Sequence, residues 1–237
     1  MVTSLALAQA ENVPAWSPTI ADAQSLAAAC EGATSCDFSC WDEAVRLLEP
    51  TERGGVRMAC YTKGESHGPI VSWHANGRKE GAGFSNMGTP VGGYIAWHPN
   101  GKAAATGRWA DGDFDGPLTT WHPNGTLQSQ GSWEHGAQTG MVRHWYDNGQ
   151  LEEVGTWRNR KPDGPVFSWY ADGTRKARAF YKDGAPHGTW KEWYSSGKRY
   201  IMARYMDGTS HIIRCWDEAG KQMVCPTADT HTVPENP

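Results

Sequence analysis

The chain has 237 residues and a formal net charge of −4, which argues against a general electrostatic attraction to nucleic acid or to an anionic membrane surface. Hydrophobic residues make up only 38%, while glycine (28 residues) and tryptophan (13 residues) are frequent, so a thin layer of rings between many turns is expected in place of a thick aliphatic core. No run of 18 apolar residues occurs, and no transmembrane segment is predicted.

Residues 1–10 form a short apolar run that ends Leu-Ala-Gln-Ala, the small-x-small form of a signal-peptide cleavage site. The charged start and most of the apolar stretch of a signal are missing. Two interpretations stay open: the remnant of a secretory signal whose start lies upstream, or a disordered terminus.

Residues 11–60 are predicted to form a small cysteine-containing helical cap, with short helices over 21–30 and 41–48. A cap is expected because the first hairpin of an array would otherwise present an unpaired strand edge. An enzyme confined to this segment is disfavoured, because the segment is too short to enclose a pocket of its own.

All six cysteines lie outside the regular part of the chain, which predicts disulfides at its two ends: Cys30, Cys36, Cys40, Cys60, Cys215 and Cys225. The last two are the favoured pair, and the first four allow three pairings. A zinc site is the competing interpretation, but no C-x-x-C spacing occurs. Disulfides favour an extracytoplasmic location (periplasm, envelope or secreted), with the cytoplasm as the alternative.

The middle of the chain repeats with a period of 24 residues. Tryptophans recur at this interval: Trp73, Trp97, Trp121, Trp145, Trp169 and Trp193. Glycines four residues further on keep the same step, and an aromatic column closes most units (Trp109, Trp133, Trp157, Tyr181 and Tyr205). A fixed period of this length predicts a stacked array.

Two turn signals in each unit predict a β-hairpin. Asn-Gly, as at 148–149, is expected to form the tight turn, and D-G-x-x-x-G, as at 183–188, a slightly longer connection. The fold class is all-β: an elongated antiparallel meander of about seven hairpins over residues 61–222, followed by a disordered tail at 223–237.

One column in the second strand of each unit is always small: Gly83, Gly107, Gly131, Gly155, Ala179 and Ala203. Glycine inside a strand often marks a close packing contact. We therefore expect the first-strand tryptophan of each unit to lie across this column of a neighbouring strand.

The stretch Gly-Ser-Trp-Glu-His-Gly-Ala-Gln-Thr-Gly at 131–140 resembles the MORN repeat. The apolar Val142, where the usual unit has glycine, and the ending W-[HY]-x-[ND]-G are similar to the bacterial MORN-variant repeat of secreted or envelope proteins and of some antitoxin-type proteins. The resemblance implies a β-hairpin array with a protein or lipid contact role, and it supplies no active site.

One column of polar-tipped rings is the candidate binding stripe: His74, His98, His122, Tyr146, Tyr170 and Tyr194. Plain sheet surface is the favoured interpretation of this column, and a contact ridge is the alternative. Rings on successive hairpins are about 10 Å apart, so no two can share a metal ion. The D-x-D-x-D-G string at 111–116 could ligate calcium, but turn chemistry already explains it. Glu152 and Glu153 are expected on opposite faces, so they would not form an acid–base pair.

No cofactor, metal or catalytic residue is predicted. The favoured function is a non-enzymatic scaffold outside the cytoplasm that binds a protein, or an envelope component or glycan. The alternative is a cytoplasmic antitoxin-like or regulatory module that binds a partner protein, and phospholipid binding is disfavoured by the acidic balance. The sequence fixes neither the partner nor the oligomeric state.

Overall fold

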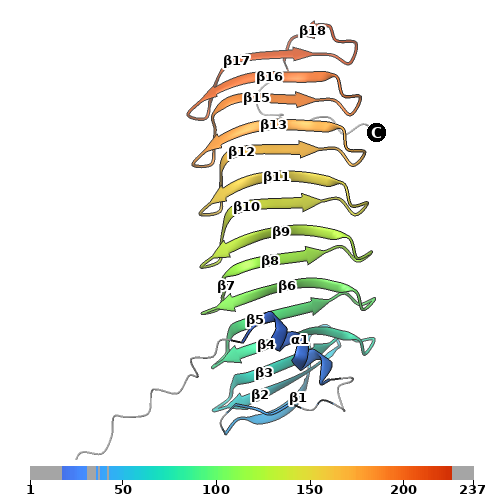
Figure 1. Ribbon diagram of the computed structural model, residues 1–237, viewed down its shortest axis with the longest axis vertical. Helices are drawn as coiled ribbons and strands as arrows, with labels where there is room; N and C mark the ends of the chain where they lie inside the picture. Colours follow the sequence, from blue (N-terminus) through green and yellow to red (C-terminus); the bar gives the residue numbers. More distant parts are fainter. Residues whose placement is uncertain (1–17, 31–35, 37, 42, 226–237) are drawn as a thin grey trace, which may run out of the picture.

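The computed structural model describes residues 18–30, 36, 38–41 and 43–225. These residues form one antiparallel sheet of 18 strands. Apart from β7 and β14, two-residue segments that pair with the strand before them, each strand pairs with the next one along the chain. The result is an elongated open ladder (Figure 1), and the predicted all-β hairpin array is confirmed.

The described elements have the following bounds: α1 (Ile20–Ala28), β1 (Val45–Pro50), β2 (Val56–Thr62), β3 (Glu65–Trp73), β4 (Lys79–Asn86), β5 (Thr89–Trp97), β6 (Ala103–Ala110), β7 (Asp113–Phe114), β8 (Gly116–Trp121), β9 (Leu127–Glu134), β10 (Ala137–Trp145), β11 (Leu151–Arg158), β12 (Lys161–Trp169), β13 (Arg175–Lys182), β14 (Ala185–Pro186), β15 (Gly188–Trp193), β16 (Arg199–Met206), β17 (Thr209–Trp216) and β18 (Gln222–Met223).

The connection between units is the tighter of the two turns. Asp183 and Gly184 both have positive φ, 50° and 88°, and the flanking residues Lys182 and Ala185 are directly paired. These are the features of a two-residue type I′ turn, whose twist matches that of the strands. The expectation that this connection is the longer turn is wrong.

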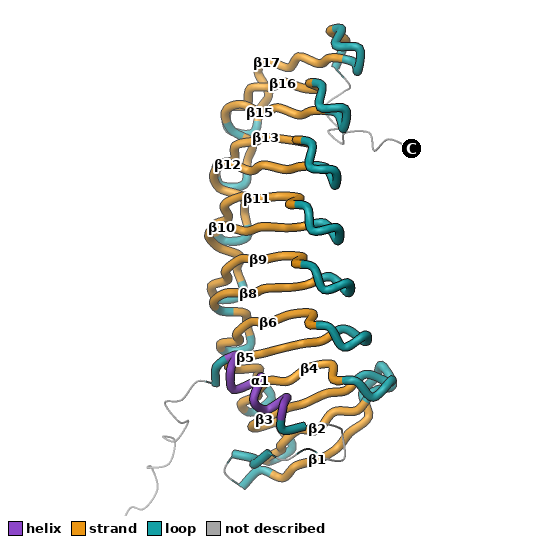
Figure 2. Tube along the Cα trace, turned by 45° about the vertical axis from the view of Figure 1, so that its right-hand side comes forward, coloured by secondary structure: helices purple, strands orange, loops and turns teal. Residues whose placement is uncertain are grey.

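The Asn-Gly segment lies in a longer loop. In the loop at 146–150, the Tyr146 N–H donates to the Gln150 carbonyl and the Gly149 N–H donates to the Tyr146 carbonyl, both at 2.9 Å. Only the glycine has positive φ, as in a type I turn followed by a one-residue bulge. These loops lie above one another along one side of the ladder, at the ends of the strands (Figure 2). Asn148 is therefore not needed for a left-handed backbone.

The two faces of the sheet carry different columns. Directly opposed residues on neighbouring strands share a face, which allows one row to be followed from β2 to β17. We call it the central row: Met58, Val71, Ala82, Ile95, Thr106, Thr119, Gln130, Arg143, Val154, Phe167, Arg178, Lys191, Met202 and Arg214. The small column lies on the other side, which we call the glycine face.

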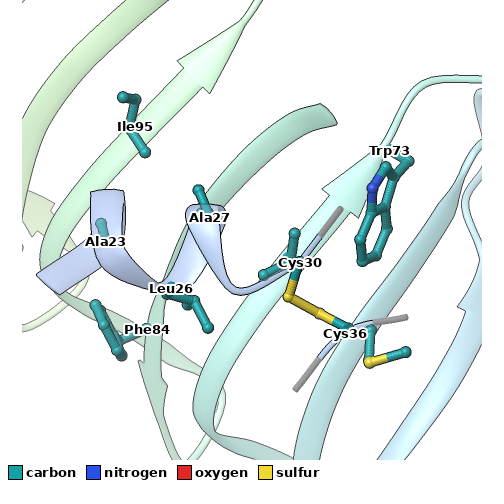
Figure 3. Packing of buried hydrophobic residues seen from close by; sticks show 11 residues of the cluster. Ala23, Leu26, Ala27, Cys30, Cys36, Trp73, Phe84 and Ile95 are labelled. Atoms are coloured by element: carbon teal, nitrogen blue, oxygen red, sulfur yellow. A yellow bond between two sulfur atoms is a disulfide. The ribbon is translucent and has the colours of Figure 1, made fainter. Parts of the chain in front are cut away.

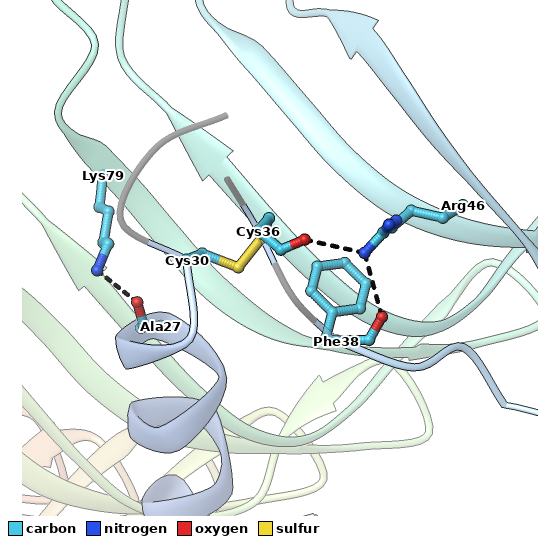
Figure 4. Close-up of a disulfide and its surroundings, with 6 residues drawn as sticks. All are labelled: Ala27, Cys30, Cys36, Phe38, Arg46 and Lys79. Atoms are coloured by element: carbon cyan, nitrogen blue, oxygen red, sulfur yellow. Dashed lines mark hydrogen bonds between the residues drawn. A yellow bond between two sulfur atoms is a disulfide. The ribbon is translucent and has the colours of Figure 1, made fainter. Parts of the chain in front are cut away.

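Helix α1 lies on the face of the central row, which we call the helix face. It begins with a capping box in which the Asp22 N–H donates to the Thr19 hydroxyl (3.2 Å) and the Thr19 N–H donates to the Asp22 carboxylate (2.6 Å). Its buried side packs on Val71, Ala82, Phe84 and Ile95 through the residues Ala23, Leu26 and Ala27 (Figure 3). At its C-terminal end, the Lys79 ammonium donates to the Ala27 carbonyl (Figure 4).

A glycine admits the start of this helix. The Gly93 N–H donates to the Pro18 carbonyl at 2.7 Å, and a Cβ at position 93 would lie 1.9 Å from the Thr19 carbonyl oxygen. The same position in the other units holds a side chain: Pro69, Pro117, Met141, Pro165 and Thr189. Among these units, glycine occurs in this column only at position 93, under the start of α1. This departure from the repeat was visible in the sequence, but the prediction did not use it.

The helix predicted over 41–48 is wrong, because residues 45–50 form strand β1. It pairs with β2 from Val45 opposite Tyr61 to Pro50 opposite Val56. A two-turn helix is marginal by itself, whereas this strand satisfies the backbone groups of β2. The first predicted helix is confirmed as α1, slightly shorter than expected.

Three cysteine pairs lie at disulfide distance: Cys30–Cys36, Cys40–Cys60 and Cys215–Cys225, and none of the six cysteines is free. The favoured pairing at the C-terminal end is confirmed. Cys30–Cys36 lies in the segment after α1, and Cys40–Cys60 ties this segment to β2. The Arg46 guanidinium also donates to the Cys36 and Phe38 carbonyls of the same segment (Figure 4). Such pairs are typical of an oxidising compartment.

The sequence segments predicted as a signal remnant (1–10) and most of the predicted tail (226–237) lie outside the described residues. Within the described ranges, no helix is long and apolar enough to cross a membrane.

Gly93→Ala should displace α1, since the new methyl group would overlap the Thr19 carbonyl. We expect a loss of about 1–3 kcal/mol in the free energy of unfolding, the usual cost of overpacking. Hydrogen exchange followed by mass spectrometry should show faster exchange in residues 20–28 and unchanged exchange in residues 137–216. Thr189→Ala is the matched control, and equal protection of α1 in all three proteins would contradict this docking.

Candidate functional site

Each ring of the candidate binding stripe reaches the next unit. The His74, His98 and His122 Nε2 atoms lie 2.9, 2.8 and 2.7 Å from the carbonyl oxygens of Trp97, Trp121 and Trp145. The Tyr146, Tyr170 and Tyr194 hydroxyls donate to the Trp169, Trp193 and Trp216 carbonyls at 2.9, 2.8 and 3.0 Å. We call these six hydrogen bonds the ring ladder.

The ring ladder explains why either histidine or tyrosine can occupy this column. Both side chains place a donor at the end of a flat ring, and a carbonyl oxygen can only accept. The three histidines therefore carry a proton on Nε2. The polar tips are used within the array, and a binding role for this stripe stays a prediction.

A second ladder joins the loops. The Asn76, Asn100, Asn124 and Asn148 Nδ2 atoms donate to the carbonyls of Pro99, Pro123, Asp147 and Ala171 in the next loop, at 2.8, 2.6, 2.5 and 2.7 Å. Each asparagine Oδ1 also accepts the N–H two residues further on in its own loop. In the loop where Asp172 replaces asparagine, only the second contact can form, because a carboxylate does not donate.

On the glycine face, the small column packs against other residues than expected. A Cβ at Gly155 would lie 2.6 Å from the Trp157 ring and 2.8 Å from Val166 Cγ2, and one at Gly131 would lie 3.0 Å from Val142 Cγ2 and 3.2 Å from the Trp133 ring. The closing aromatic column and the directly opposed apolar residue thus cover the small column. The expectation that the first-strand tryptophans do so is wrong.

The register gives the reason, because Trp190 is directly opposed to Ala203 of the small column and Trp193, three residues further along the same strand, points to the other face. A bulge also lies next to each first-strand tryptophan, as between Glu192 and Trp193. The tryptophans lie on the helix face, where Trp73 and Trp97 belong to the cluster around α1. Further along the sheet, the guanidinium groups of Arg175 and Arg199 lie over the rings of Trp193 and Trp216 at 5.2 and 5.3 Å.

The same kind of bulge affects the glutamate pair. Glu153 is paired with His144, whereas the next partner, Trp145, is paired with Leu151, so Glu152 is the extra residue. Strict alternation is interrupted, and the expected separation of Glu152 and Glu153 onto opposite faces does not hold. Burial raises the pKa of the Glu153 carboxyl, the nearby His144 opposes this shift, and the charge of Glu152 adds to it.

Desolvation raises the pKa of two tyrosines of the ring ladder. Desolvation, with a smaller contribution from Glu192, raises the pKa of Tyr170 to about 12. The pKa of Tyr194 is raised mainly by desolvation as well. Both hydroxyls therefore remain donors in the ring ladder over the whole physiological range.

The uncovered part of the helix face is basic. From β10 to β17 the central row reads Arg143, Val154, Phe167, Arg178, Lys191, Met202 and Arg214, with four cations and no carboxylate. Residues 136–216 carry thirteen Lys and Arg against eight Asp and Glu, a net +5 in a chain of −4. We call these seven residues the basic row. These residues occupy repeated positions in the sequence, but only the strand register shows that they form one continuous row.

The described part of the chain holds no group of three or more His, Cys, Asp or Glu residues placed to bind a metal ion. In the string at 111–116, Asp111 has a φ of 49° and belongs to a two-residue turn, as turn chemistry predicts.

The comparisons with known proteins agree with this architecture. Residues 114–135, 138–159 and 186–207 match the family model of the MORN repeat variant. MORN repeats are in general protein- or membrane-binding modules without catalytic activity. A comparison with curated proteins finds no match.

Gly131→Val should destabilise the protein by about 1–3 kcal/mol, because the added methyl groups meet Val142 and the Trp133 ring. Ser132→Val is the control, since this exposed neighbour lies on the other face. Chemical unfolding measures both. Equal stability of the two variants would contradict the close contact at the small column.

Tyr170→Phe should cost about 1 kcal/mol near neutral pH through loss of the hydrogen bond to the Trp193 carbonyl. The wild-type pKa is raised, so the stability linked to this hydroxyl is complete below about pH 10 and is lost as the pH rises towards 12. The variant should therefore lose less stability than wild type between pH 10 and 12. Tyr181→Phe removes a hydroxyl outside the ring ladder and is the control at pH 8. Urea unfolding at pH 8 and pH 11 measures the change. The prediction fails if Tyr170→Phe is as stable as wild type at pH 8, or if it loses as much stability as wild type between the two pH values.

Proposed function

We propose that this protein is a non-enzymatic scaffold that works outside the cytoplasm and holds a partner protein against the long faces of its sheet. The observation that carries the proposal is the contrast between the ends and the middle of the array. Disulfides and α1 close the first strands, and Cys215–Cys225 closes the last hairpin. The helix face between them is open from β10 to β17.

The architecture suits binding because successive units repeat one geometry. Two ladders of hydrogen bonds fix each loop on the next, so the face behaves as a preorganised surface and binding does not have to order it. Rings and arginines dominate this surface, and these residue types are enriched in interfaces between proteins. The MORN-variant matches support the same function.

The proposed location rests on the cysteines. Three disulfides in 237 residues are typical of secreted or periplasmic proteins and rare in the cytosol. A cytoplasmic antitoxin-like module would instead keep its thiols reduced.

The test has two parts. Thiol labelling of protein purified without reductant from its native source should find no reactive thiol, and six reactive thiols would contradict the location. The immobilised full chain should then retain a protein from the matching native fraction after chemical cross-linking. When purified, this protein should bind saturably in calorimetry, and the absence of any saturable partner would contradict the scaffold function.

A further inference from the structure

The basic row lies on the same face of the sheet as a site that is already occupied within the same chain. α1 lies across β3–β6 and covers Val71, Ala82 and Ile95 of the central row, together with Trp73 and Phe84. Four units later, at a shift of 96 residues, the equivalent positions are Phe167, Arg178, Lys191, Trp169 and Phe180. The fold thus presents the surface under α1 a second time, with rings retained and two apolar residues replaced by cations. Thr189 stands in the place of Gly93, so a helix bound there cannot begin over this column as α1 does.

These two cations are placed unfavourably for the isolated chain. Arg178 and Lys191 are directly opposed on β13 and β15. Like charges in this position destabilise a sheet. Among the described residues neither forms an ion pair, although the Arg178 guanidinium lies 5.7 Å from the centre of the Phe167 ring. A partner that brings carboxylates would remove this repulsion.

The apolar part of the second site is accessible. Phe180 is 43% exposed, and Phe167, Trp169 and Trp193 are half-buried. A charged rim around exposed rings is the arrangement that binding surfaces use, because the rings supply buried area and the charges supply selectivity.

The backbone limits what can bind there. β12, β13, β15 and β16 lie inside the sheet and are paired on both sides, so an added strand finds no free edge. A helix needs no backbone partners. The packing of Ala23, Leu26 and Ala27 of α1 shows that the central row and its neighbouring rings accept the side of a helix (Figure 3).

We propose that the helix face over β12–β16 binds a short amphipathic helix of a partner protein. Its apolar side packs on Phe167 and Phe180, and its carboxylates pair with Arg178 and Lys191. The proposal rests on the scaffold function and adds the surface and the chemistry of the partner.

The probe is a helix-stapled, fluorescent peptide with the sequence of residues 21–29, changed by Ala23→Glu and Ala27→Glu. It omits residues 18–20, which need the glycine at position 93. These two positions lie on the buried side of α1, the side that faces the sheet (Figure 3). A second peptide carries Ala23→Lys and Ala27→Lys. Fluorescence anisotropy with the full, unreduced chain should show saturable binding of the glutamate peptide and at least tenfold weaker binding of the lysine peptide.

The decisive variant is Arg178→Glu with Lys191→Glu. It should weaken binding of the glutamate peptide at least tenfold and bind the lysine peptide better than wild type does. Arg53→Glu with Lys63→Glu changes the net charge equally at exposed positions near β2, and this control should bind like wild type. Equal losses of glutamate-peptide affinity in the decisive variant and the control would overturn the docking site.

The native partner separates this inference from the function on which it rests. A partner that binds wild type and the control but not the decisive variant supports the site. A partner that binds all three proteins equally overturns the site and leaves the scaffold function standing, whereas the absence of any partner for wild type contradicts the function itself.

Discussion

The hydrogen bond from a ring tip to the tryptophan carbonyl of the next unit is the contact on which the array depends. It joins residues 22 or 23 apart, for example Tyr170 and Trp193, so it fixes each loop against its neighbour independently of the strand ladder. Its chemistry requires only a donor on a flat ring, and three histidines and three tyrosines meet that requirement. The asparagine ladder beside it repeats the connection between loops. Together the two ladders hold successive hairpins in one register.

A fixed register gives the sheet two faces with different functions. On the glycine face, the missing Cβ at positions such as Gly155 lets the opposed valine and the closing indole approach the backbone, and this packing holds the units together. Over much of its length, the helix face does not take part in this packing between units. It holds α1 at one end and carries the basic row at the other, so its residues can vary in character along the array without breaking the stack.

The ends limit the array in different ways. β1 adds an outer strand to β2. The pair Cys40–Cys60 ties the preceding chain to β2, and Cys30–Cys36 closes a short loop after α1. At the other end, the Cys215–Cys225 pair joins β17 to the chain that follows the two-residue strand β18. Closing the ends in this way leaves the faces, and not the edges, as the extended surfaces for binding.

The sequence by itself determined the period, the hairpins, the residues that form α1 and the pairing of Cys215 with Cys225, because these depend on local spacing and turn chemistry. It did not determine which turn is tighter or which residues cover Gly155, since both depend on the register between the strands, which opposes Gly155 to Val166. β1 and the special role of Gly93 also needed the tertiary structure, because both follow from contacts with distant segments. The basic row was present in the sequence as separate columns, and only strand pairing placed Arg178 beside Lys191.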